Sequence, residues 1–410
     1  MSDAGRIVIV GAGLAGDTAA ATLREIGYGG SVAMIGDEPH RPYDRPPLSK
    51  GALLSAEAAA NVFFRPESWY ETNNIDLRLG DAVARITPAG HFITLRSGAD
   101  LSYDKLLIAT GARPRRLGIL EPLGSRVFYL RTLEDSVALR AALTPSARVI
   151  VVGAGVIGLE IAASAATNSC EVAVLELAGR VMARSVSPTV SRFAEEYHRG
   201  RGVRILCGVQ ISRAYLEGGH AIIELADGQR LQADVVVAGV GAEPVTEIAR
   251  NAGLVVDDGI VVDRYTRTSD PDIHAAGDVT RFESIRRECL TRTEHWRHAI
   301  DQAIVAARVM AGQEESYREK PWVWSDQYEL NIQITGECSG ETEIIRGSTA
   351  AASFVAFQLR GGRLVGAIAV NQPRLKKPIA DLVAAEIVAD PTILADSATD
   401  LKKLAAALPK

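Results

Sequence analysis

The sequence contains the same glycine pattern twice, and this duplication restricts the fold more than any other feature. The pattern Gly-x-Gly-x-x-Gly occupies residues 11–16 and returns at residues 153–158. Each copy directly follows a short apolar run, Arg6–Val10 or Arg148–Val152, and precedes a stretch rich in helix-forming residues. A strand, a tight glycine turn and a helix in this order form the phosphate-binding part of a dinucleotide-binding βαβ unit. The sequence therefore predicts an α/β fold with two Rossmann-like domains, each binding one dinucleotide.

Each glycine of the pattern has a separate physical role. The first permits the tight turn, the second lets the backbone approach a pyrophosphate, and the third lets the helix pack on the strand. The helix N-terminus then presents free N–H groups and the positive end of its dipole to the phosphates. The residues expected to contact the two ligands are Gly11, Gly13, Leu14, Ala15 and Gly16 in the first copy, and Gly153, Gly155, Val156, Ile157 and Gly158 in the second.

An acidic residue follows the second strand of each copy. Asp37 and Glu176 come 26 and 23 residues after the first glycine of their copy, near the ~20 expected for a carboxylate that binds a ribose hydroxyl. A fixed carboxylate at Glu176 favours NADH, because it repels the 2′-phosphate of NADPH, whereas Arg180 and Arg184 offer that phosphate a partner. We expect NADH, with Arg184 bonding its pyrophosphate or ribose; the alternative for Glu176 is an exposed acid at a strand end.

Composition excludes several classes of protein. The 410 residues predict two or three domains, and a net charge of −5 gives no electrostatic footprint for nucleic acid or an anionic membrane. The apolar run Val149–Ala166 is interrupted by glycines and contains Glu160, which argues against a membrane span. No cysteine pair has metal-ligand or redox spacing, so we expect no metal site and a reducing, cytoplasmic location. The cysteines are Cys170, Cys207, Cys289 and Cys338.

Later buried strands favour a flavin as the first dinucleotide. Leu106–Gly111 and Asp234–Gly241 are apolar runs that end in glycine and close the first and second unit. The run Ile273–Val279 carries Gly277 and Asp278 where a third such strand ends. A carboxylate at that place can accept hydrogen bonds from ribityl hydroxyls, and the next helix N-terminus then faces the isoalloxazine ring.

Four sequence blocks resemble one known family. They are Arg41–Lys50 (Arg-Pro-Tyr-Asp-Arg-Pro-Pro-Leu-Ser-Lys), Tyr103–Gly111, Ala276–Asp278 and Pro321–Gln327 (Pro-Trp-Val-Trp-Ser-Asp-Gln). Together with the paired glycine turns, they resemble FAD-dependent ferredoxin reductases, above all the reductase components of bacterial aromatic-ring dioxygenases such as the biphenyl dioxygenase reductase. Putidaredoxin reductase and rubredoxin reductase are related to this group. The resemblance extends over nearly the whole chain.

The resemblance implies three domains and an electron-transfer function. Residues 1–112 and 242–320 would form a discontinuous FAD-binding domain, residues 113–241 an NADH-binding domain, and residues 321–410 a C-terminal α+β interface domain. Electrons would pass from NADH through FAD to a small [2Fe-2S] ferredoxin, of Rieske type, which serves the terminal oxygenase of an aromatic-ring dioxygenase system. The protein would be a monomer or a homodimer. Two alternatives are a redoxin reductase serving a cytochrome P450 or alkane hydroxylase, and an NAD-sensing flavoprotein like apoptosis-inducing factor.

By the same resemblance, Lys50 and Glu160 are the catalytic pair. The Lys50 ammonium would lie near flavin N5 and pair with Glu160 on the first turn of the second fingerprint helix. A buried cation stabilises the negative charge of reduced flavin, and a carboxylate can orient the nicotinamide carboxamide. The alternatives are a solvated lysine at a helix start and a first-turn acid that complements the helix dipole. No cysteine lies near Pro46–Lys50, which argues against a disulfide reductase.

The resemblance also implies further cofactor contacts. For FAD these are Asp37, Arg45, Lys50, Val83, Ala109, Thr110, Gly111, Arg131, Gly277, Asp278, Glu294, Trp296, Ala299 and Trp322. For NADH they are Glu160, Glu176, Arg184 and Gly241. Trp322 and Trp324 would either stack beside the isoalloxazine or pack in a core. A charged stretch around Arg281–Arg297, with Arg374, Lys376 and Lys377, would steer an acidic ferredoxin or be an ordinary solvated face. His298 stands where relatives usually carry Asn, which affects hydrogen bonding at the flavin O2 edge.

Overall fold

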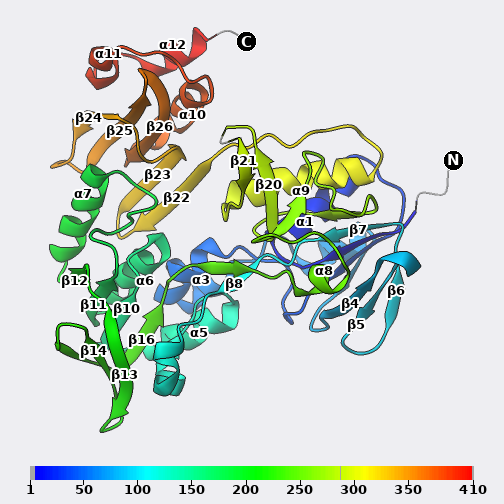
Figure 1. Ribbon diagram of the computed structural model, residues 1–410, viewed down its shortest axis with the longest axis horizontal. Coiled ribbons are helices and arrows are strands. Elements are labelled where there is room, and N and C mark those ends of the chain that lie inside the picture. The colour runs from blue at the N-terminus through cyan, green and yellow to red at the C-terminus, as the bar shows by residue number, and fades with distance from the viewer. Residues whose placement is uncertain (1–4, 287, 409–410) are drawn as a thin grey trace. The chain divides into compact units, whose positions relative to one another are not determined.

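The computed structural model describes residues 5–286 and 288–408 (Figure 1). Contacts group the chain into two compact units, each assembled from three segments. Unit 1 contains the chain up to Asp44, Val62–Arg113 and Ala242–Lys320; unit 2 contains Arg45–Asn61, Pro114–Gly241 and the chain from Pro321 on. The segment Arg45–Asn61, expected in the FAD domain, thus groups with unit 2, and the C-terminal segment groups there too. The division into three domains stays a prediction.

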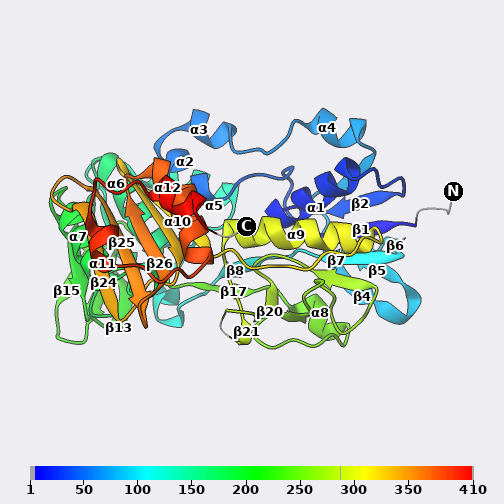
Figure 2. The ribbon, with the colours of Figure 1, turned by 90° about the horizontal axis from the view of Figure 1, so that it is seen from above.

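Unit 1 is built on a parallel five-stranded sheet in the order β19-β7-β1-β2-β3. Every residue of β1 and β2 is buried, as their unbroken apolar sequences require of strands covered on both faces. Helices α1 and α9 pack against each other on one side of this sheet (Figure 2). The strand bounds are β1 Ile7–Val10, β2 Val32–Ile35, β3 Ile75–Arg78, β7 Lys105–Ile108 and β19 Ile273–Ala275.

Smaller sheets and the helices complete unit 1. The sheet β4-β5-β6 is antiparallel. The sheet β18-β20-β21 is mixed, because β18 and β20 are parallel and β20 and β21 are antiparallel. Strand β8 pairs with β17. The helices are α1 Leu14–Glu25, α4 Glu67–Thr72, α8 Glu247–Asn251 and α9 Trp296–Met310. The strands are β4 Val83–Thr87, β5 Phe92–Leu95, β6 Asp100–Ser102, β8 Ala112–Pro114, β17 Ala242–Pro244, β18 Ile260–Val262, β20 Thr280–Ser284 and β21 Cys289–Thr291.

Unit 2 repeats the parallel architecture with the strand order β12-β11-β10-β16-β9. A three-stranded antiparallel sheet, β13-β14-β15, is inserted before β16. The strands are β9 Val127–Phe128, β10 Arg148–Val152, β11 Glu171–Glu176, β12 Arg204–Cys207, β13 Ile211–Glu217, β14 His220–Leu225, β15 Arg230–Ala233 and β16 Val235–Ala238. The helices are α2 Gly51–Leu54, α3 Ala56–Ala60, α5 Leu133–Ala142, α6 Val156–Thr167 and α7 Pro188–Arg199.

The C-terminal segment adds an antiparallel sheet to unit 2, in the order β22-β23-β26-β25-β24. Its central strand β26 is buried at seven of eight positions because both faces are covered. One face packs on residues of α6 and α7, and the other on α10, α11 and α12 (Figure 1). The bounds are β22 Trp322–Gln327, β23 Leu330–Gly336, β24 Thr342–Ser348, β25 Ser353–Arg360, β26 Arg363–Val370, α10 Lys376–Ala384, α11 Pro391–Ala395 and α12 Leu401–Ala406.

The two parallel sheets and the C-terminal α+β segment confirm the predicted fold class. One helix start differs from the sequence-based expectation. The first helix was expected to follow the glycine pattern at residues 11–16, but it begins at Leu14, inside that pattern. Helix α9 begins at Trp296, so Glu294 precedes it. Within the described ranges, every helix is too short or too polar to cross a bilayer.

Candidate functional site

The first and third glycines of both turns lie too close to backbone atoms for any side chain. A Cβ on Gly11 would come within 2.2 Å of the Ala109 carbonyl oxygen, and one on Gly153 within 2.4 Å of the Gly239 oxygen. Both residues also have positive φ angles, +115° and +102°. In each copy a Cβ on the third glycine would lie 2.0 Å from the carbonyl oxygen of the first. These glycines are needed for the turn itself.

The middle glycine of each turn faces open space instead. A Cβ on Gly13 or Gly155 would meet no protein atom within 4 Å. Each of these glycines is the N-cap of the following helix and lacks a side-chain cap, so backbone N–H groups of the first turn point into that space. Open volume beside uncapped helix N–H groups fits a pyrophosphate. The two turns therefore match the geometry that a dinucleotide requires.

In unit 1, the third strand end meets the first glycine turn and helix α9. A Cβ on Gly277, which follows β19, would lie 3.3 Å from Ala15 Cβ and 3.6 Å from Ala299 Cβ. Gln302 of α9 accepts a 3.0 Å hydrogen bond from the Gly277 N–H. The buried Gln302 Nε2 has no hydrogen-bond partner within the described part of the chain. The N-termini of α1 and α9 and the Gly277 strand end are candidate walls of a flavin site.

The other residues predicted to bind FAD are divided between the units. Ala109, Thr110 and Gly111 follow β7 in unit 1, where the Thr110 hydroxyl donates to the Val245 carbonyl at 2.8 Å. Asp37 is exposed just beyond β2. The remaining predicted residues in unit 1 are Val83, Asp278, Glu294 and Trp296, and those in unit 2 are Arg45, Lys50, Arg131 and Trp322.

Three of these residues make contacts that fix their positions. Trp296 Nε1 donates to Asp44 Oδ1 at 2.9 Å. In unit 2, Arg45 Nη1 donates to the carbonyl oxygen of Arg131 at 2.6 Å. Arg131 itself lies just before α5, which begins with a capping box formed by Thr132 and the acid three residues later.

The strand-end acid of unit 2 is held rigidly. Glu176 accepts hydrogen bonds from the backbone N–H groups of Ala154 (2.6 Å) and Ala178 (2.7 Å), so its carboxylate lies against the second glycine turn. Arg180 donates to two backbone carbonyls of its own loop, at 2.8 and 2.9 Å. The Arg184 guanidinium lies 3.9 Å from the Cβ position of Gly241. A fixed carboxylate with Arg180 already engaged favours a 2′-hydroxyl over a 2′-phosphate.

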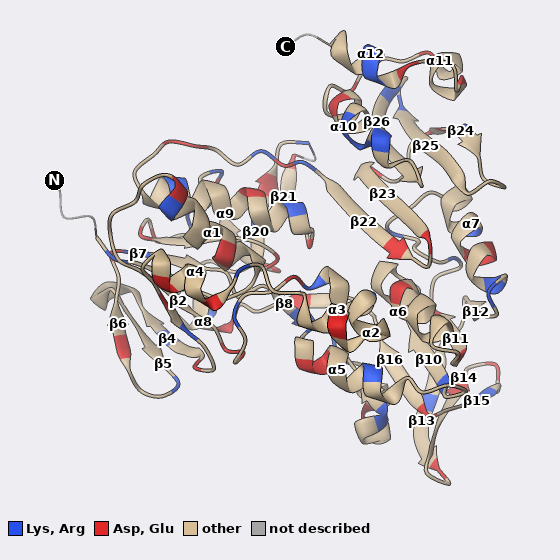
Figure 3. Ribbon diagram, turned by 180° about the vertical axis from the view of Figure 1, so that it is seen from behind, with Lys and Arg blue, Asp and Glu red and all other residues tan. Residues whose placement is uncertain are grey.

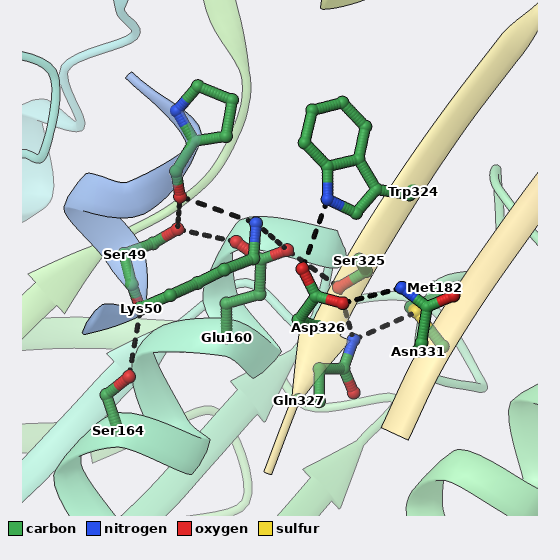
Figure 4. A network of polar contacts seen from close by, with 11 residues as sticks. Ser49, Lys50, Glu160, Ser164, Met182, Trp324, Ser325, Asp326, Gln327 and Asn331 are labelled. Carbon is green, nitrogen blue, oxygen red and sulfur yellow. Dashed lines mark hydrogen bonds and ion pairs between the residues drawn. The ribbon is translucent and has the colours of Figure 1, made fainter. Parts of the chain in front are cut away.

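Lys50 and Glu160 form an ion pair in unit 2, in which the carboxylate is buried and the ammonium is partly exposed (Figure 4). Lys50 Nζ lies 3.1 Å from Glu160 Oε1 and also donates to the Pro46 carbonyl at 3.3 Å. The lysine side chain is 17% exposed and that of Glu160 only 3%. The Pro-Pro pair starts the short 3-10 turn Pro46–Ser49 and presents Lys50 at its end. The predicted pairing is thus present in the structure, while its catalytic role stays a prediction.

Glu160 does not lie in the first turn of its helix, contrary to our expectation. It is the fifth residue of α6, beyond the region where a helix dipole acts strongly on a side chain. Burial raises the pKa of Glu160, while Lys50 and the hydroxyls of Ser49 and Ser325 lower it. The net effect is a raised pKa, because desolvation is the largest contribution. A carboxylate kept this dry needs its three donors to stay ionised.

Sequence reasoning missed those hydroxyl donors. Ser49 Oγ donates to Glu160 Oε2 at 2.5 Å, and Ser325 Oγ donates to Oε1 at 2.7 Å. Ser325 in turn receives a 3.0 Å hydrogen bond from Gln327 Nε2. Ser49, Ser325 and Gln327 lie inside the blocks Arg41–Lys50 and Pro321–Gln327, where only Arg45, Lys50 and the two tryptophans had expected roles. Their alternation on β22, at positions 325 and 327, was the available signal, since such positions share one face of a strand.

The two tryptophans of β22 stack on each other between two lysines. Their ring centroids are 5.0 Å apart with an interplanar angle of 15°. Lys376 Nζ lies 3.4 Å from the Trp322 centroid and Lys50 Nζ lies 5.5 Å from the Trp324 centroid. The column therefore runs from the Lys50–Glu160 pair to the start of α10.

The charged stretch Arg281–Arg297 is largely neutralised by acids. Arg281 pairs with Asp257 at 2.7 Å, Arg297 pairs with Asp301 at 2.7 Å, and Arg292 pairs with Glu294. Arg287, another member of the stretch, lies outside the described residues. In the described part of the chain, no three His, Cys, Asp or Glu side chains gather as a metal site.

His298 is buried in a polar cluster of unit 1. Its Nδ1 lies 2.7 Å from the Tyr317 hydroxyl and its Nε2 3.3 Å from the Thr280 hydroxyl, and its ring stacks on Phe282. Burial lowers the pKa of His298 to about 4. The histidine is therefore neutral, and both ring nitrogens face hydroxyls of the cluster.

Comparison with known proteins agrees with this geometry. Residues 5–303 match the model of the pyridine nucleotide-disulphide oxidoreductase family. The chain belongs to the pyridine nucleotide-disulphide oxidoreductase family. Residues 322–405 match the reductase C-terminal family. These matches confirm the resemblance on which the sequence analysis relied, and enzymes of this kind use FAD and NAD(H).

Within the family, three ferredoxin-linked reductases are similar over nearly their full length. The 3-phenylpropionate/cinnamic acid dioxygenase ferredoxin–NAD(+) reductase component of Photorhabdus laumondii is 40% identical over 381 residues, 92% of this chain and 95% of that protein. The ferredoxin reductase for the CYP199A2 system of Rhodopseudomonas palustris is 40% identical, with a TM-score of 0.94 over 98% of this chain and 99% of that one. The covalent putidaredoxin reductase–putidaredoxin complex matches at 36% identity, TM-score 0.93, over 99% of both chains.

Proposed function

We propose that this oxidoreductase is an NADH-dependent ferredoxin reductase that passes electrons through FAD to a small [2Fe-2S] ferredoxin. The observation that carries this proposal is the ion pair of Lys50 with the buried Glu160, which lies on the helix that begins at the second glycine turn. A charge pair at this depth is costly to fold, which favours a chemical role over a purely structural one. The similarity to ferredoxin-linked reductases supports the same function.

The two glycine turns supply the two cofactor sites of the proposal. Gly13 and the N-terminus of α1 would hold the FAD pyrophosphate, with Asp37 on a ribose and Gly277 and Asp278 at the ribityl chain. Gly155 and the N-terminus of α6 would hold the NADH pyrophosphate, with Glu176 on its ribose and Arg184 and Gly241 beside it. When bound, FAD accepts a hydride from NADH and releases its electrons one at a time.

The protein groups would bind, orient and stabilise charge. The Lys50 ammonium would stabilise the negative charge that develops at the cofactor, because a partly buried cation interacts more strongly than one in water. Glu160 lies 3.1 Å from this ammonium and would keep it in place. Its carboxylate would also orient the nicotinamide carboxamide. No protein nucleophile or general base is needed for this scheme.

A disulfide reductase is the enzyme class that the family name suggests, and the sequence argues against it. Such an enzyme needs a redox-active cysteine pair beside its flavin. The corresponding segment is Pro46–Lys50, and the nearest cysteine in sequence is Cys170. Each of the four cysteines is a free thiol in the structure. We therefore propose that Lys50 and Glu160 take the place of the redox-active cysteine pair of a disulfide reductase.

The tryptophan column marks where the ferredoxin would dock. Trp322 and Trp324 stack between Lys50 and Lys376, and helix α10 begins with consecutive lysines (Figure 3). Cationic residues at the outer end of an aromatic column suit an acidic partner. We propose a Rieske-type ferredoxin of an aromatic-ring dioxygenase system; a redoxin serving a cytochrome P450 is the second candidate, because a P450-system reductase is equally similar at 40% identity.

A panel assay tests the proposal. Purified protein with NADH is offered Rieske-type ferredoxin, plant-type ferredoxin, putidaredoxin-like protein and rubredoxin, and the kcat/KM values are compared. We expect fast flavin bleaching by NADH and the highest efficiency with the Rieske-type protein. A highest efficiency with the putidaredoxin-like protein favours the P450 candidate. A long-lived charge-transfer complex and no turnover with any partner would contradict the proposal and favour an NAD-sensing flavoprotein.

A further inference from the structure

A chain of buried hydrogen bonds connects Glu160 to strand β22 and helix α7 of unit 2, and Figure 4 shows its part from Glu160 to Gln327. Ser325 donates to Glu160, Gln327 Nε2 donates to Ser325 Oγ at 3.0 Å, and Gln327 Oε1 lies 3.0 Å from His198 Nε2. Ser325 is 1% exposed, and Gln327 and His198 are fully buried. The chain therefore runs from α7 through β22 to α6 without contact with water.

The direction of every bond in the chain follows when Glu160 is ionised, the state that Lys50 and the hydroxyls of Ser49 and Ser325 favour. An ionised carboxylate only accepts, so the Ser325 hydroxyl must donate its single hydrogen to it. Ser325 Oγ then has only lone pairs for Gln327, which must turn its NH2 toward the serine and its carbonyl toward His198. That carbonyl requires an N–H on His198 Nε2. Each member thus donates toward the carboxylate, an arrangement in which hydrogen bonds polarise one another.

The far end of the chain agrees with this assignment. Among the described residues, His198 Nδ1 has no hydrogen-bond partner, as expected for the lone pair of a neutral imidazole with its proton on Nε2. Burial lowers the pKa of His198, which keeps the ring neutral. Gln327 Nε2 has a second contact, 3.7 Å to Met182 Sδ, which also fixes the amide orientation.

We propose that Ser325, Gln327 and His198 are positioning residues that hold the Glu160 carboxylate, and through it the Lys50 ammonium, in a single geometry for hydride transfer. This inference rests on the proposed function of the Lys50–Glu160 pair. It gives strand β22, which belongs to the C-terminal segment, a second task besides carrying the tryptophans. Without it, Oε1 of Glu160 would have only Lys50 as a donor.

A purely structural role explains the chain less well. Strand β22 packs on α6, where apolar side chains of the same volume would bury more apolar surface and avoid the cost of desolvating polar groups. A buried polar chain is useful where every member is satisfied and one geometry must be selected. Here Ser325, Gln327 and His198 form a chain of hydrogen bonds that ends on Oε1 of Glu160. The other carboxylate oxygen, Oε2, already accepts a 2.5 Å hydrogen bond from Ser49.

The test is Ser325→Ala, measured by two independent signals. The first is infrared titration of the Glu160 carboxyl, assigned by difference from Glu160→Gln and recorded with and without FAD. Loss of one donor to a buried carboxylate should raise its proton affinity about tenfold. The second is stopped-flow reduction of the bound flavin by NADH, expected to slow about tenfold, with the dissociation constant of NADH changed less than about twofold. Ser325→Thr retains the hydroxyl and should restore both signals.

Matched controls remove buried groups of the same kind elsewhere in unit 2. Ser191, 1% exposed, donates only to the Val181 carbonyl, and Gln358, 2% exposed, contacts Glu343 and Gly340. Ser191→Ala and Gln358→Met should leave both signals at wild-type values. Gln327→Met should shift both signals in the same direction as Ser325→Ala, but less.

The possible outcomes decide the inference. The inference is overturned if Ser325→Ala keeps the wild-type titration of Glu160 and the wild-type rate of flavin reduction. It is also overturned if the control variants change both signals as much as Ser325→Ala does. If Ser325→Ala loses FAD or stability, Gln327→Met decides: shifted signals support the chain and unchanged signals overturn it. A protein whose Glu160 titration responds as expected but which reduces no iron–sulfur protein would refute the proposed function and leave the positioning role standing.

Discussion

Helices α1 and α6 follow equivalent glycine turns, and each carries one buried carboxylate near its start. Asp17 comes directly after the third glycine of the first copy and Glu160 two residues after that of the second. Both are 3% exposed, and burial raises the pKa of both. The glycines of the two turns have nearly the same steric surroundings. The two acids therefore differ mainly in the side chains that they contact.

Those partners separate an acid that joins two helices from the acid for which we propose a chemical role. Asp17 accepts from the Tyr70 hydroxyl at 2.6 Å and from Arg65 at 3.1 Å, and Arg65 is itself stacked 4.1 Å over the Trp69 ring. This cluster fastens α4 to α1 within unit 1. Glu160 holds a lysine, a compact cation whose three donors can turn toward a ligand. Equivalent glycine turns thus precede helices that carry two buried carboxylates, Asp17 and Glu160. Only Glu160 lies beside a lysine, for which we propose a chemical role.

The largest expected effect distinguishes the two turns by their ligands. Gly13→Ala and Gly155→Ala each put a methyl group into space that is empty of protein but needed by a pyrophosphate. We expect Gly13→Ala to yield protein without bound flavin. Gly155→Ala should keep its flavin but bind NADH about 1,000-fold more weakly, which is ~4 kcal/mol. Flavin absorbance and NADH titration measure the two effects.

A third glycine supplies the control for this pair. Gly118 also has open space around its Cβ position but lies outside both turns, so Gly118→Ala should bind both cofactors normally. Loss of flavin in Gly155→Ala, or retention of both cofactors in both variants, would contradict the assignment of one dinucleotide to each turn.

The next effect separates the two acids themselves. Asp17→Ala leaves the buried Tyr70 hydroxyl and Arg65 without their acceptor and should lower the free energy of unfolding by about 3 kcal/mol. The flavin that remains bound should be reduced by NADH at the wild-type rate. Glu160→Gln retains the shape but leaves Lys50 without its counter-ion and turns an NH2 group toward a donor. It should therefore also lower the free energy of unfolding, by about 3 kcal/mol, but unlike Asp17→Ala it should slow flavin reduction. Urea unfolding measures the free energy of unfolding of both variants, and stopped-flow absorbance measures their rates of flavin reduction.

Tyr70→Phe refines this prediction. It removes one donor from Asp17 and keeps Arg65, so its expected cost is about 1 kcal/mol. The comparison between the two acids fails if Asp17→Ala slows flavin reduction as much as Glu160→Gln does.

The sequence predicted the turns well and the partners poorly, for a physical reason. Glycine spacing and apolar strands are local signals, so both βαβ units and the strand-end acid Glu176 were found from the residues alone. The Lys50–Glu160 pair joins residues 110 positions apart and came only from resemblance. Ser325 and Gln327 were not assigned, because an alternating polar pair on a strand is the usual mark of a solvent face. Whether such a face meets water or a buried carboxylate depends on long-range packing.

A smaller effect concerns the acids at the strand ends. Glu176→Arg replaces a carboxylate held by two backbone N–H groups and should weaken NADH binding by ~1–3 kcal/mol, the cost of a lost charge-assisted hydrogen bond. The affinity for NADPH should rise relative to that for NADH. Michaelis constants for both nucleotides measure the change. Glu171→Arg, on an exposed position at the start of the same strand, should change neither.

The smallest effect at neutral pH concerns a histidine of unit 1 and emerges only on acidification. His298 has its pKa lowered to about 4 by burial, whereas an unfolded histidine has a pKa near ~6.5. Between these values the unfolded chain binds more protons than the native one, so stability is fully present above about pH 6.5 and is lost as the pH falls toward about 4. At pH 5, His298 accounts for a loss of about 2 kcal/mol in the free energy of unfolding.

His298→Asn should therefore reduce the loss of unfolding free energy between pH 7 and pH 5 by that amount, with flavin fluorescence in urea as the measurement. His91→Asn is the matched control, because that ring is 48% exposed and its backbone φ of +50° is one that asparagine accepts. We expect its pH dependence to equal that of the wild type. Identical pH profiles for His298→Asn and wild type would contradict this contribution of His298. They would leave two other buried histidines whose pKa is lowered by burial, His274 in unit 1 and His198 in unit 2, as the groups to substitute next.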